Sequence, residues 1–265
     1  MLVYYFILTK TMLSIIIPAY NEENRIVNTL DSYYNFFNKK YQKNFEILVV
    51  VNGSTDKTIQ IVKKYSKNKK QIRYFNEGKI YKGGAIIKGF KEAKGELIGF
   101  VDADNSTKPE AFYDLIQQID NYDGIIGSRW MKESVVKPKQ PLTRRIASRV
   151  FNILIRTLFR INVRDSQCGN KLFKKEAVKK IENEIGIARW AFDINLLYLL
   201  KINNFKVKEV TTVWSDAEGS KLNVKKASIE MFLAIIRLRL LYSPFKFIVR
   251  LYDNTMMFLR KSFTL

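Results

Sequence analysis

L-I-G-F-V-D-A-D, residues 97–104, joins a short apolar run to two acidic residues that stand two positions apart. The run predicts a buried strand over 97–101, and Asp102 and Asp104 follow it directly. Alternation along an extended chain sends both carboxylates to one side of the backbone. Two hard oxygen ligands on one side can hold Mg²⁺ or Mn²⁺, while a diphosphate and water supply the other ligands. The stretch therefore predicts a strand that ends in a metal site for a phosphorylated ligand.

Two earlier stretches repeat this arrangement of an apolar run followed by turn and polar residues. S-I-I-I-P-A-Y-N-E-E spans 14–23, and V-V-V-N-G-S-T-D spans 49–56. The carboxyl ends of parallel strands meet at one edge of a sheet, which is where open α/β proteins bind nucleotides. An isolated Asp-x-Asp pair is more often a solvated turn, but its place after the fourth strand of such a unit favours a metal site. We therefore expect the three loops to form one nucleotide pocket.

Apolar spacing around these stretches predicts alternating strands and helices as far as residue 130. The predicted strands cover 13–17, 45–51, 72–75, 97–101 and 123–127, and the predicted helices cover 24–40, 57–66, 85–94 and 109–119. Pro18 is expected to end the first strand, and Gly83 and Gly84 are expected to open the third helix. The alternation indicates an α/β fold with a doubly wound, Rossmann-like, mostly parallel sheet that carries helices on both faces.

The pattern changes after residue 130. Further helices are predicted at 142–161, 175–183 and 191–202, with a short strand after 165 and another at 206–213. In the first of these helices arginines form one ridge and apolar residues another: Arg145, Arg149, Arg156 and Arg160 against Ile146, Val150, Ile153, Leu154 and Leu158. The tail from residue 226 is also apolar and basic. Basic amphipathic helices of this kind are typical of a membrane interface, and a solvated charged face is the alternative interpretation.

Charge and composition narrow the class of partner. The chain has 46 Lys and Arg residues against 25 Asp and Glu residues, a formal net charge of +21, which indicates nucleic acid, anionic lipid or a phosphorylated substrate as partner. It has no His, which excludes triads, metal sites and general bases that depend on His. Cys168 is the single cysteine, so no intrachain disulfide can form and a reducing compartment is indicated.

No run approaches the roughly 20 apolar residues that span a bilayer, and residues 2–8 lack the features of a signal peptide. We therefore expect a peripheral or monotopic protein on the cytoplasmic face of a membrane. Three parts are predicted: an extension over 1–12, one domain over 13–225 and a membrane-associating helical segment over 226–265.

Two further features fit a phosphate-binding pocket. Lys82-Gly83-Gly84 resembles a phosphate-binding turn, since bare glycine backbone and a helix N-terminus both favour an anion. Its spacing matches neither a P-loop nor G-x-G-x-x-G. In the first loop the ring of Tyr20 can line a base and Glu22 can accept from a ribose. The alternative is an ordinary helix start, with Asn21 as the cap and the acids near the positive end of the helix dipole.

Taken together, the segments resemble family-2 glycosyltransferases of the GT-A fold, in the branch of polyprenyl-phosphate sugar transferases. P-A-Y-N-E-E-N-R-I (18–26) is similar to the family's first nucleotide loop, and D-S-Q-C-G-N-K-L-F (165–173) to its D-x-Q-C-G-F-K-x-F segment. R-W-A-F-D-I-N-L-L-Y (189–198) and W-S-D-A-E-G-S-K-L (214–222) resemble the dolichyl-phosphate β-glucosyltransferases in particular. Two departures stand out: Val51 and Asn52 occupy the place of an Asp-Asp pair, and Asn170 replaces a Phe.

The resemblance implies a role for each candidate residue. Nucleotide binding falls to Pro18, Ala19, Tyr20, Glu22, Asn52, Lys82, Asp102 and Ala103. Acceptor-phosphate binding falls to Arg129, Arg144, Ser148, Gln167, Ser220 and Lys221. Asp102 and Asp104 are the metal ligands and, with Asp193, the catalytic candidates; Asp193 either recognises sugar hydroxyls or acts as a base.

The implied activity is inverting, metal-dependent transfer of a sugar from a nucleotide sugar to a polyprenyl or dolichyl phosphate. UDP-glucose or a related UDP-sugar is the expected donor, with Mg²⁺ or Mn²⁺ as cofactor. The acceptor phosphate is already ionised near neutral pH, with a second pKa of about 6, so it needs orientation more than deprotonation. Two alternatives remain open within the enzyme class, GDP-mannose as donor and a soluble sugar as acceptor. A third is a non-catalytic basic protein that binds a membrane or nucleic acid.

Overall fold

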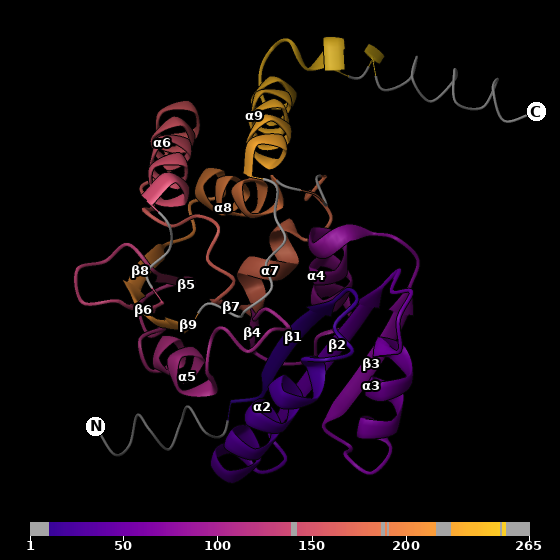
Figure 1. Cartoon of the computed structure of the whole chain (residues 1–265). Coiled ribbons are helices and arrows are strands. Elements are labelled where there is room, and N and C mark those ends of the chain that lie inside the picture. The colour runs from indigo at the N-terminus through magenta and orange to yellow at the C-terminus, as the bar shows by residue number, and fades with distance from the viewer. Residues whose placement is uncertain are drawn as a thin grey trace, which may run out of the picture.

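The sheet at the centre of the molecule has seven strands and is mostly parallel, as predicted. The computed structural model describes residues 11–138, 142–186, 189, 191–215, 224–249 and 251–252. Its main strands are β1 (Leu13–Ala19), β2 (Phe45–Asn52), β3 (Ile72–Glu77), β4 (Leu97–Phe100), β5 (Gly124–Ser128), β7 (Lys171–Lys174) and β8 (Val207–Thr211). They are arranged in the order β3-β2-β1-β4-β7-β5-β8 (Figure 1).

One strand of this sheet runs against the others. β1 pairs with β2 and β4 in parallel, and β5 pairs with β8 in parallel. β7 lies antiparallel between β4 and β5. Because β7 runs the opposite way, the loop that precedes it lies at the same edge as the carboxyl ends of β1, β2 and β4. The topology thus brings the 165–170 segment to the loops that follow these three strands.

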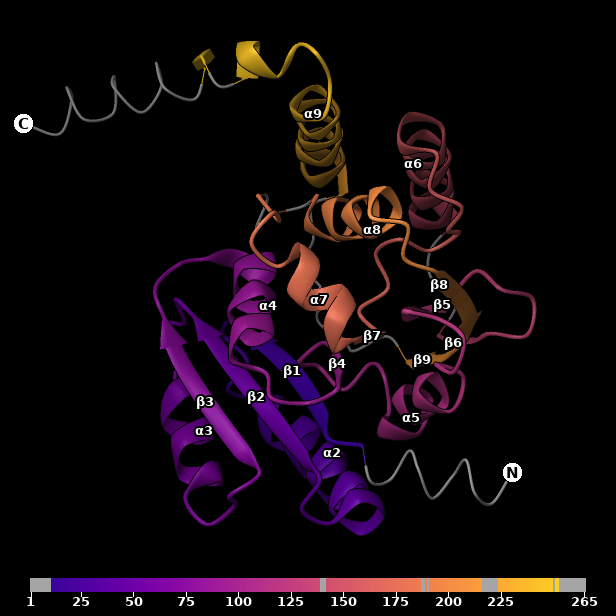
Figure 2. The same ribbon diagram turned by 180° about the vertical axis from the view of Figure 1, so that it is seen from behind.

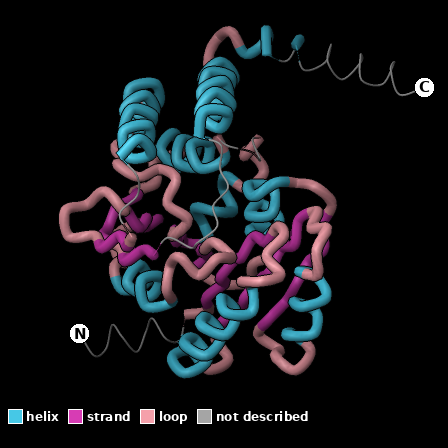
Figure 3. Tube along the Cα trace, in the orientation of Figure 1, coloured by secondary structure: helices cyan, strands magenta, loops and turns pink. Residues whose placement is uncertain are grey.

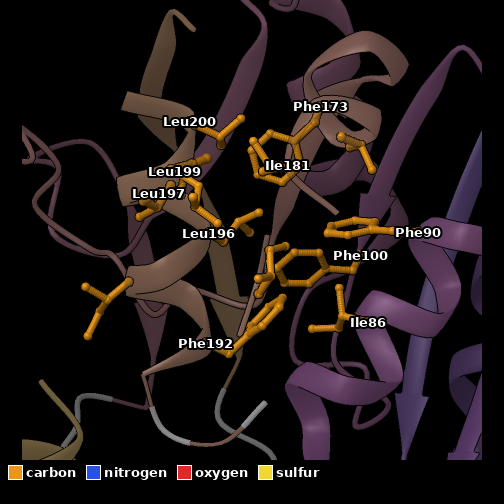
Figure 4. Packing of buried hydrophobic residues seen from close by; sticks show 14 of the residues in the cluster. Ile86, Phe90, Phe100, Phe173, Ile181, Phe192, Leu196, Leu197, Leu199 and Leu200 are labelled. Carbon is orange, nitrogen blue, oxygen red and sulfur yellow. The ribbon is translucent and has the colours of Figure 1, made fainter. Parts of the chain in front are cut away.

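Helices cover both faces of the sheet, as Figure 3 shows. They are α2 (Ile26–Tyr41), α3 (Thr58–Ser66), α4 (Tyr81–Glu92), α5 (Pro109–Gln117), α7 (Lys175–Ile181) and α8 (Phe192–Ile202). In β1, Ile15 and Ile17 belong to the core under α2, α3 and α5, and Ile16 to the core under α4, α7 and α8. This alternation is the expected result of period-two side-chain placement in a strand that is buried on both faces. On the second face Phe90, Phe100 and Phe192 gather from separate elements (Figure 4).

Two longer helices, α6 (Leu142–Phe159) and α9 (Val224–Leu241), lie beside each other next to α8, away from β1 and β2 (Figures 1 and 2). Ile155 and Phe159 of α6 and Ile235 and Leu238 of α9 are buried in the core. Among the described residues, none of the helices has both the length and the apolar character needed to span a bilayer. The predicted boundary at residues 225 and 226 stays a prediction.

The structure corrects several predicted boundaries. Pro18 does not end β1: it pairs with Val50, and the strand continues to Ala19. The ladder with β4 stops at Ile16, so the missing proline N–H loses no partner on that side. α4 begins at Tyr81, so the two glycines lie within its first turn instead of before it. The predicted strand over 206–213 is two strands, because β9 (Val213–Ser215) leaves the main sheet to pair with β6 (Val135–Lys137).

Candidate active site

Asp102 lies at the end of β4, in contact with Lys82 from the first turn of α4. The Lys82 ammonium forms an ion pair with Oδ1 of Asp102. Burial would raise the pKa of Asp102, but the ion pair with Lys82, together with the charges of Lys171 and Arg129, outweighs it and lowers that pKa. Burial would likewise lower the pKa of Lys82, but the carboxylates of Asp102 and Asp193 raise it. Both groups are therefore held in their charged forms at neutral pH.

The other oxygen of Asp102 faces the turn before β7. A Cβ atom added to Gly169 would lie 2.0 Å from Oδ2 of Asp102 and 2.5 Å from its Cγ. No Cβ fits there while Asp102 keeps this position, so glycine is favoured by a close approach instead of by an unusual dihedral angle. The carboxylate is thus fixed between an ammonium group and a glycine backbone.

The first two loops are joined by hydrogen bonds between backbone and side chains. Asn21 has a positive φ of 54°, and its Oδ1 accepts from the Thr55 N–H at 2.8 Å. The Glu22 N–H donates to Oγ1 of Thr58 at 2.8 Å, and the Glu23 N–H donates to the carboxylate of Asp56 at 3.1 Å. Asn21 therefore does not cap α2, contrary to one sequence interpretation: the residue before that helix is Arg25, which makes no side-chain cap. The bonds hold the two loops as one unit.

The acidic pair influences the pKa of Glu22 in this unit. Burial raises the pKa of Glu22, and although Arg25 opposes the effect through an ion pair at 2.8 Å, the charges of Asp104 and Asp102 add to it. The loop that carries Glu22 follows β1, which runs parallel to β2 and β4, so this loop and the acidic pair lie at the same edge of the sheet. The loops after β1, β2 and β4 thus lie at one edge of the sheet, and their forming a nucleotide pocket stays a prediction.

The remaining nucleotide candidates surround the same edge. Pro18, Ala19 and Ala103 are buried, whereas the side chain of Tyr20 is half exposed. Asn52 is buried and its amide donates to the Ala19 carbonyl at 3.0 Å, so one N–H group is already used to join β2 to β1. A base can meet only the other atoms of this side chain.

Arg129 is engaged in a way that the sequence did not reveal. Its Nε and Nη2 donate to Oδ2 and Oδ1 of Asp165 at 2.7 and 2.9 Å, and its backbone N–H donates to Oδ2 at 3.0 Å. Burial would lower the pKa of this guanidinium, but Asp165 raises it further above its usual value. The pair takes two of the five N–H donors of arginine and fixes the orientation of its plane.

The other acceptor candidates are less completely placed. Ser148 of α6 and Gln167 are partly buried. Arg144 belongs to α6, but the structure does not describe its side chain, and Ser220 and Lys221 lie outside the described residues. The neighbouring Cys168 is fully buried, and burial, with Asp165 adding to it, raises the pKa of its thiol to about 11. This cysteine is therefore a thiol at neutral pH and no nucleophile.

The acidic pair fits a metal that shares its ligands with a diphosphate. Among the described residues no three or more His, Cys, Asp or Glu side chains gather in one place as a complete metal site. Asp102 and Asp104 supply two carboxylates, and the Ser106 N–H orients Oδ1 of Asp104 at 2.9 Å. Mg²⁺ and related ions commonly take one or two carboxylates and complete their shell with substrate phosphates and water. The donor set thus suits a metal that arrives with a phosphorylated substrate.

Residues 14–182 match the family model described as glycosyl transferase family 2. The chain belongs to this family. A dolichyl-phosphate β-glucosyltransferase of Dictyostelium discoideum is 36% identical over 246 residues, which cover 87% of this chain and 74% of the relative. The Homo sapiens enzyme of the same name is 30% identical over 247 residues, 87% of this chain and 75% of the relative. The predicted enzyme class is therefore confirmed, and the non-catalytic alternative is set aside.

Solved structures share the fold of this family 2 glycosyltransferase. Glucosyl-3-phosphoglycerate synthase from Mycobacterium tuberculosis, in complex with Mn²⁺, UDP and phosphoglyceric acid, superposes with a TM-score of 0.66 at 17% identity. The match covers 89% of this chain and 81% of that one. S. aureus TarS 1–349 in complex with UDP-GlcNAc gives a TM-score of 0.59 at 21% identity, covering 88% of this chain and 67% of that one. The predicted GT-A architecture is confirmed.

Proposed function

We propose that this glycosyltransferase moves a sugar, glucose above all, from a UDP-sugar to a polyprenyl or dolichyl phosphate with inversion at the anomeric carbon. The observation that carries the proposal is Asp102, held between Lys82 and Gly169 at the edge where the loops after β1 and β2 meet. The names of the relatives support the acceptor, and the UDP complexes with the same fold support the donor.

The residues of the site then have the following tasks. Asp102 and Asp104 would hold Mg²⁺ or Mn²⁺, which when bound supplies positive charge to the departing diphosphate. Lys82 places a second positive charge at the same carboxylate, where charge on the diphosphate grows in the transition state. Tyr20, Glu22 and Asn52 line the approach for the base and ribose.

Arg129 orients the acceptor from a fixed position. Asp165 occupies one edge of its guanidinium, so a phosphate would meet the remaining N–H donors. A guanidinium that is already locked loses little entropy when it binds an anion. The acceptor phosphate is ionised near neutral pH, with a second pKa of about 6, and attack on the anomeric carbon needs no base in this chain.

An acceptor that is buried in a bilayer requires a membrane surface on the enzyme, and α6 and α9 offer one. Most of the exposed large hydrophobic residues in the described part of the chain lie on these helices or just after them: Ile146, Val150, Ile153, Ile229, Phe232, Leu233, Phe245, Phe247, Ile248, Leu251 and Tyr252. Arg145 and Arg156 of α6, and Arg160 directly after it, are exposed beside them. Apolar side chains with flanking basic residues suit an anionic lipid surface.

Membrane binding should depend on the apolar face of α6. Val150→Asp with Ile153→Asp should reduce co-sedimentation with phosphatidylserine vesicles about tenfold or more, because two apolar side chains lose their burial in lipid. Ile202→Asp is the matched control, since Ile202 is also exposed, at 46%, but ends α8 instead of lying on α6 or α9. Equal loss in both variants, or none in either, contradicts this surface.

The function itself is tested by transfer to a defined acceptor. The protein is incubated with UDP-glucose, UDP-GlcNAc or GDP-mannose, with Mn²⁺ or Mg²⁺, and with a polyprenyl phosphate, and the lipid fraction is analysed by mass spectrometry. We expect a polyprenyl-phosphate hexose from UDP-glucose that disappears when EDTA is added. A product from GDP-mannose alone contradicts the donor, and no lipid product with any donor contradicts the acceptor.

A further inference from the structure

Lys171 is a fully buried lysine in the middle of the sheet. It lies on β7, its side chain is 0% exposed, and its ammonium donates to Oδ1 of Asp193 and to the Cys168 carbonyl. The ammonium also lies 5.2 Å from the ring centroid of Phe100. Burying a charge costs free energy unless the charge is paired and hydrogen-bonded. These contacts therefore allow β7 to carry a charged lysine inside the protein.

The two partners of Lys171 come from different parts of the molecule. Asp193 is in the first turn of α8, where the positive end of the helix dipole favours a carboxylate, and α8 is anchored in the core through Phe192 and Leu196. Cys168 lies in the turn before β7, one residue before Gly169. The ammonium therefore ties this turn to a rigid helix.

The turn is the same one that contacts Asp102. The missing Cβ of Gly169 marks a position only 2.0 Å from Oδ2 of Asp102, so any displacement of the turn changes the space that is open to this carboxylate. Lys171 also contributes to the lowered pKa of Asp102, after burial and Lys82. The Lys171–Asp193 pair is thus connected to Asp102 through the backbone of residues 168 and 169.

We propose that Lys171 and Asp193 are positioning residues that set the geometry of Asp102 for the metal and its diphosphate, and that Asp193 is not a proton acceptor. The proposal rests on the proposed function for the identity of the ligand, a divalent cation with a nucleoside diphosphate. Mutation of a group that orients a metal ligand without touching the metal commonly lowers metal affinity by about 10- to 100-fold.

The decisive variant removes both charges at once. Breaking only one partner of a buried pair is strongly destabilising, whereas apolar residues of similar size in place of both are often tolerated, so Lys171→Met/Asp193→Leu should fold. We expect its affinity for Mn²⁺–UDP, measured by titration calorimetry, to fall about tenfold or more while cooperative thermal unfolding is retained. Wild-type affinity in this folded double variant overturns the proposal, because the pair would then only stabilise the fold.

A conservative variant separates positioning from base catalysis. In Asp193→Asn the amide oxygen can still accept from Lys171, so Mn²⁺–UDP affinity and kcat should both stay within about tenfold of wild type. A kcat that falls by about two orders of magnitude or more while Mn²⁺–UDP affinity is unchanged identifies a proton acceptor and overturns the proposal.

The control for the double variant is a different ion pair, which is partly buried and lies at the opposite edge of the sheet. Arg73 and Glu46 pair at 2.8 Å near the amino ends of β3 and β2. Arg73→Met/Glu46→Gln should leave Mn²⁺–UDP affinity unchanged. The affinity for Mn²⁺–UDP involves neither the acceptor nor the sugar. A wild-type enzyme that binds Mn²⁺–UDP but glycosylates no lipid phosphate therefore contradicts the proposed function. The positioning role of Lys171 and Asp193 can still be tested in that case.

Discussion

Replacing Asp102 with Asn, or Asp104 with Asn, should lower the rate of sugar transfer about a thousandfold or more. A bound metal contributes several kcal/mol to stabilisation of the leaving diphosphate, and each 1.4 kcal/mol is about tenfold in rate. Neither change alters side-chain volume, so the fold should survive. The rate is measured as the formation of glycolipid at saturating donor, with circular dichroism to monitor folding.

Asp114→Asn provides the control for this pair of variants. Asp114 is an exposed acid on α5, and its loss should leave the rate within about twofold, as for a surface substitution away from the site. If both Asp102→Asn and Asp104→Asn transfer sugar at the wild-type rate, or if EDTA has no effect, the metal assignment is wrong.

Gly169→Ala should be nearly as damaging, although it adds a single methyl group. The new Cβ would lie 2.0 Å from Oδ2 of Asp102, so either the carboxylate or the turn must move by about an ångström. A displacement of that size at a reacting centre costs about a hundredfold in rate. The variant should also weaken Mn²⁺–UDP binding in calorimetry.

Gly78→Ala is the matched control at the same edge of the sheet. A Cβ on Gly78 would meet nothing within 4 Å, so this variant should keep wild-type rate and affinity. Undiminished transfer by Gly169→Ala would show that Asp102 is not held by the turn before β7.

Much of the fold could be predicted from local pattern. The first strand, the helix over 24–40 and the strand over 45–51 agree with β1, α2 and β2 to within two residues at each end. These elements are buried on one side or on both, so their apolar spacing carries the signal. β6 and the separation of β9 from β8 were missed because three-residue strands leave no periodic pattern.

The site was predictable where it depends on loops that follow strands, and not where it depends on pairs distant in sequence. Lys82 contacts Asp102, and the loop that carries Glu22 follows β1 at the same edge of the sheet. The Arg129–Asp165 pair was missed, because the sequence shows two opposite charges but not the antiparallel β7 that brings them together. Because Arg129 is paired with Asp165, the substitution Arg129→Ala would not affect acceptor binding alone, since it also leaves a carboxylate unpaired.

The antiparallel strand also makes the surroundings of Asp102 depend on residues that lie far apart in the sequence. β1, β2, β3 and β4 all end by residue 100, whereas β7 begins at Lys171. Until β7 has paired with β4, Asp102 has neither Gly169 nor Lys171 beside it. β7 can join β4 only after a long stretch of chain has been translated, and such non-local pairing is slow. The turn that contacts Asp102 therefore comes from the later part of the chain, although Asp102 itself follows β4.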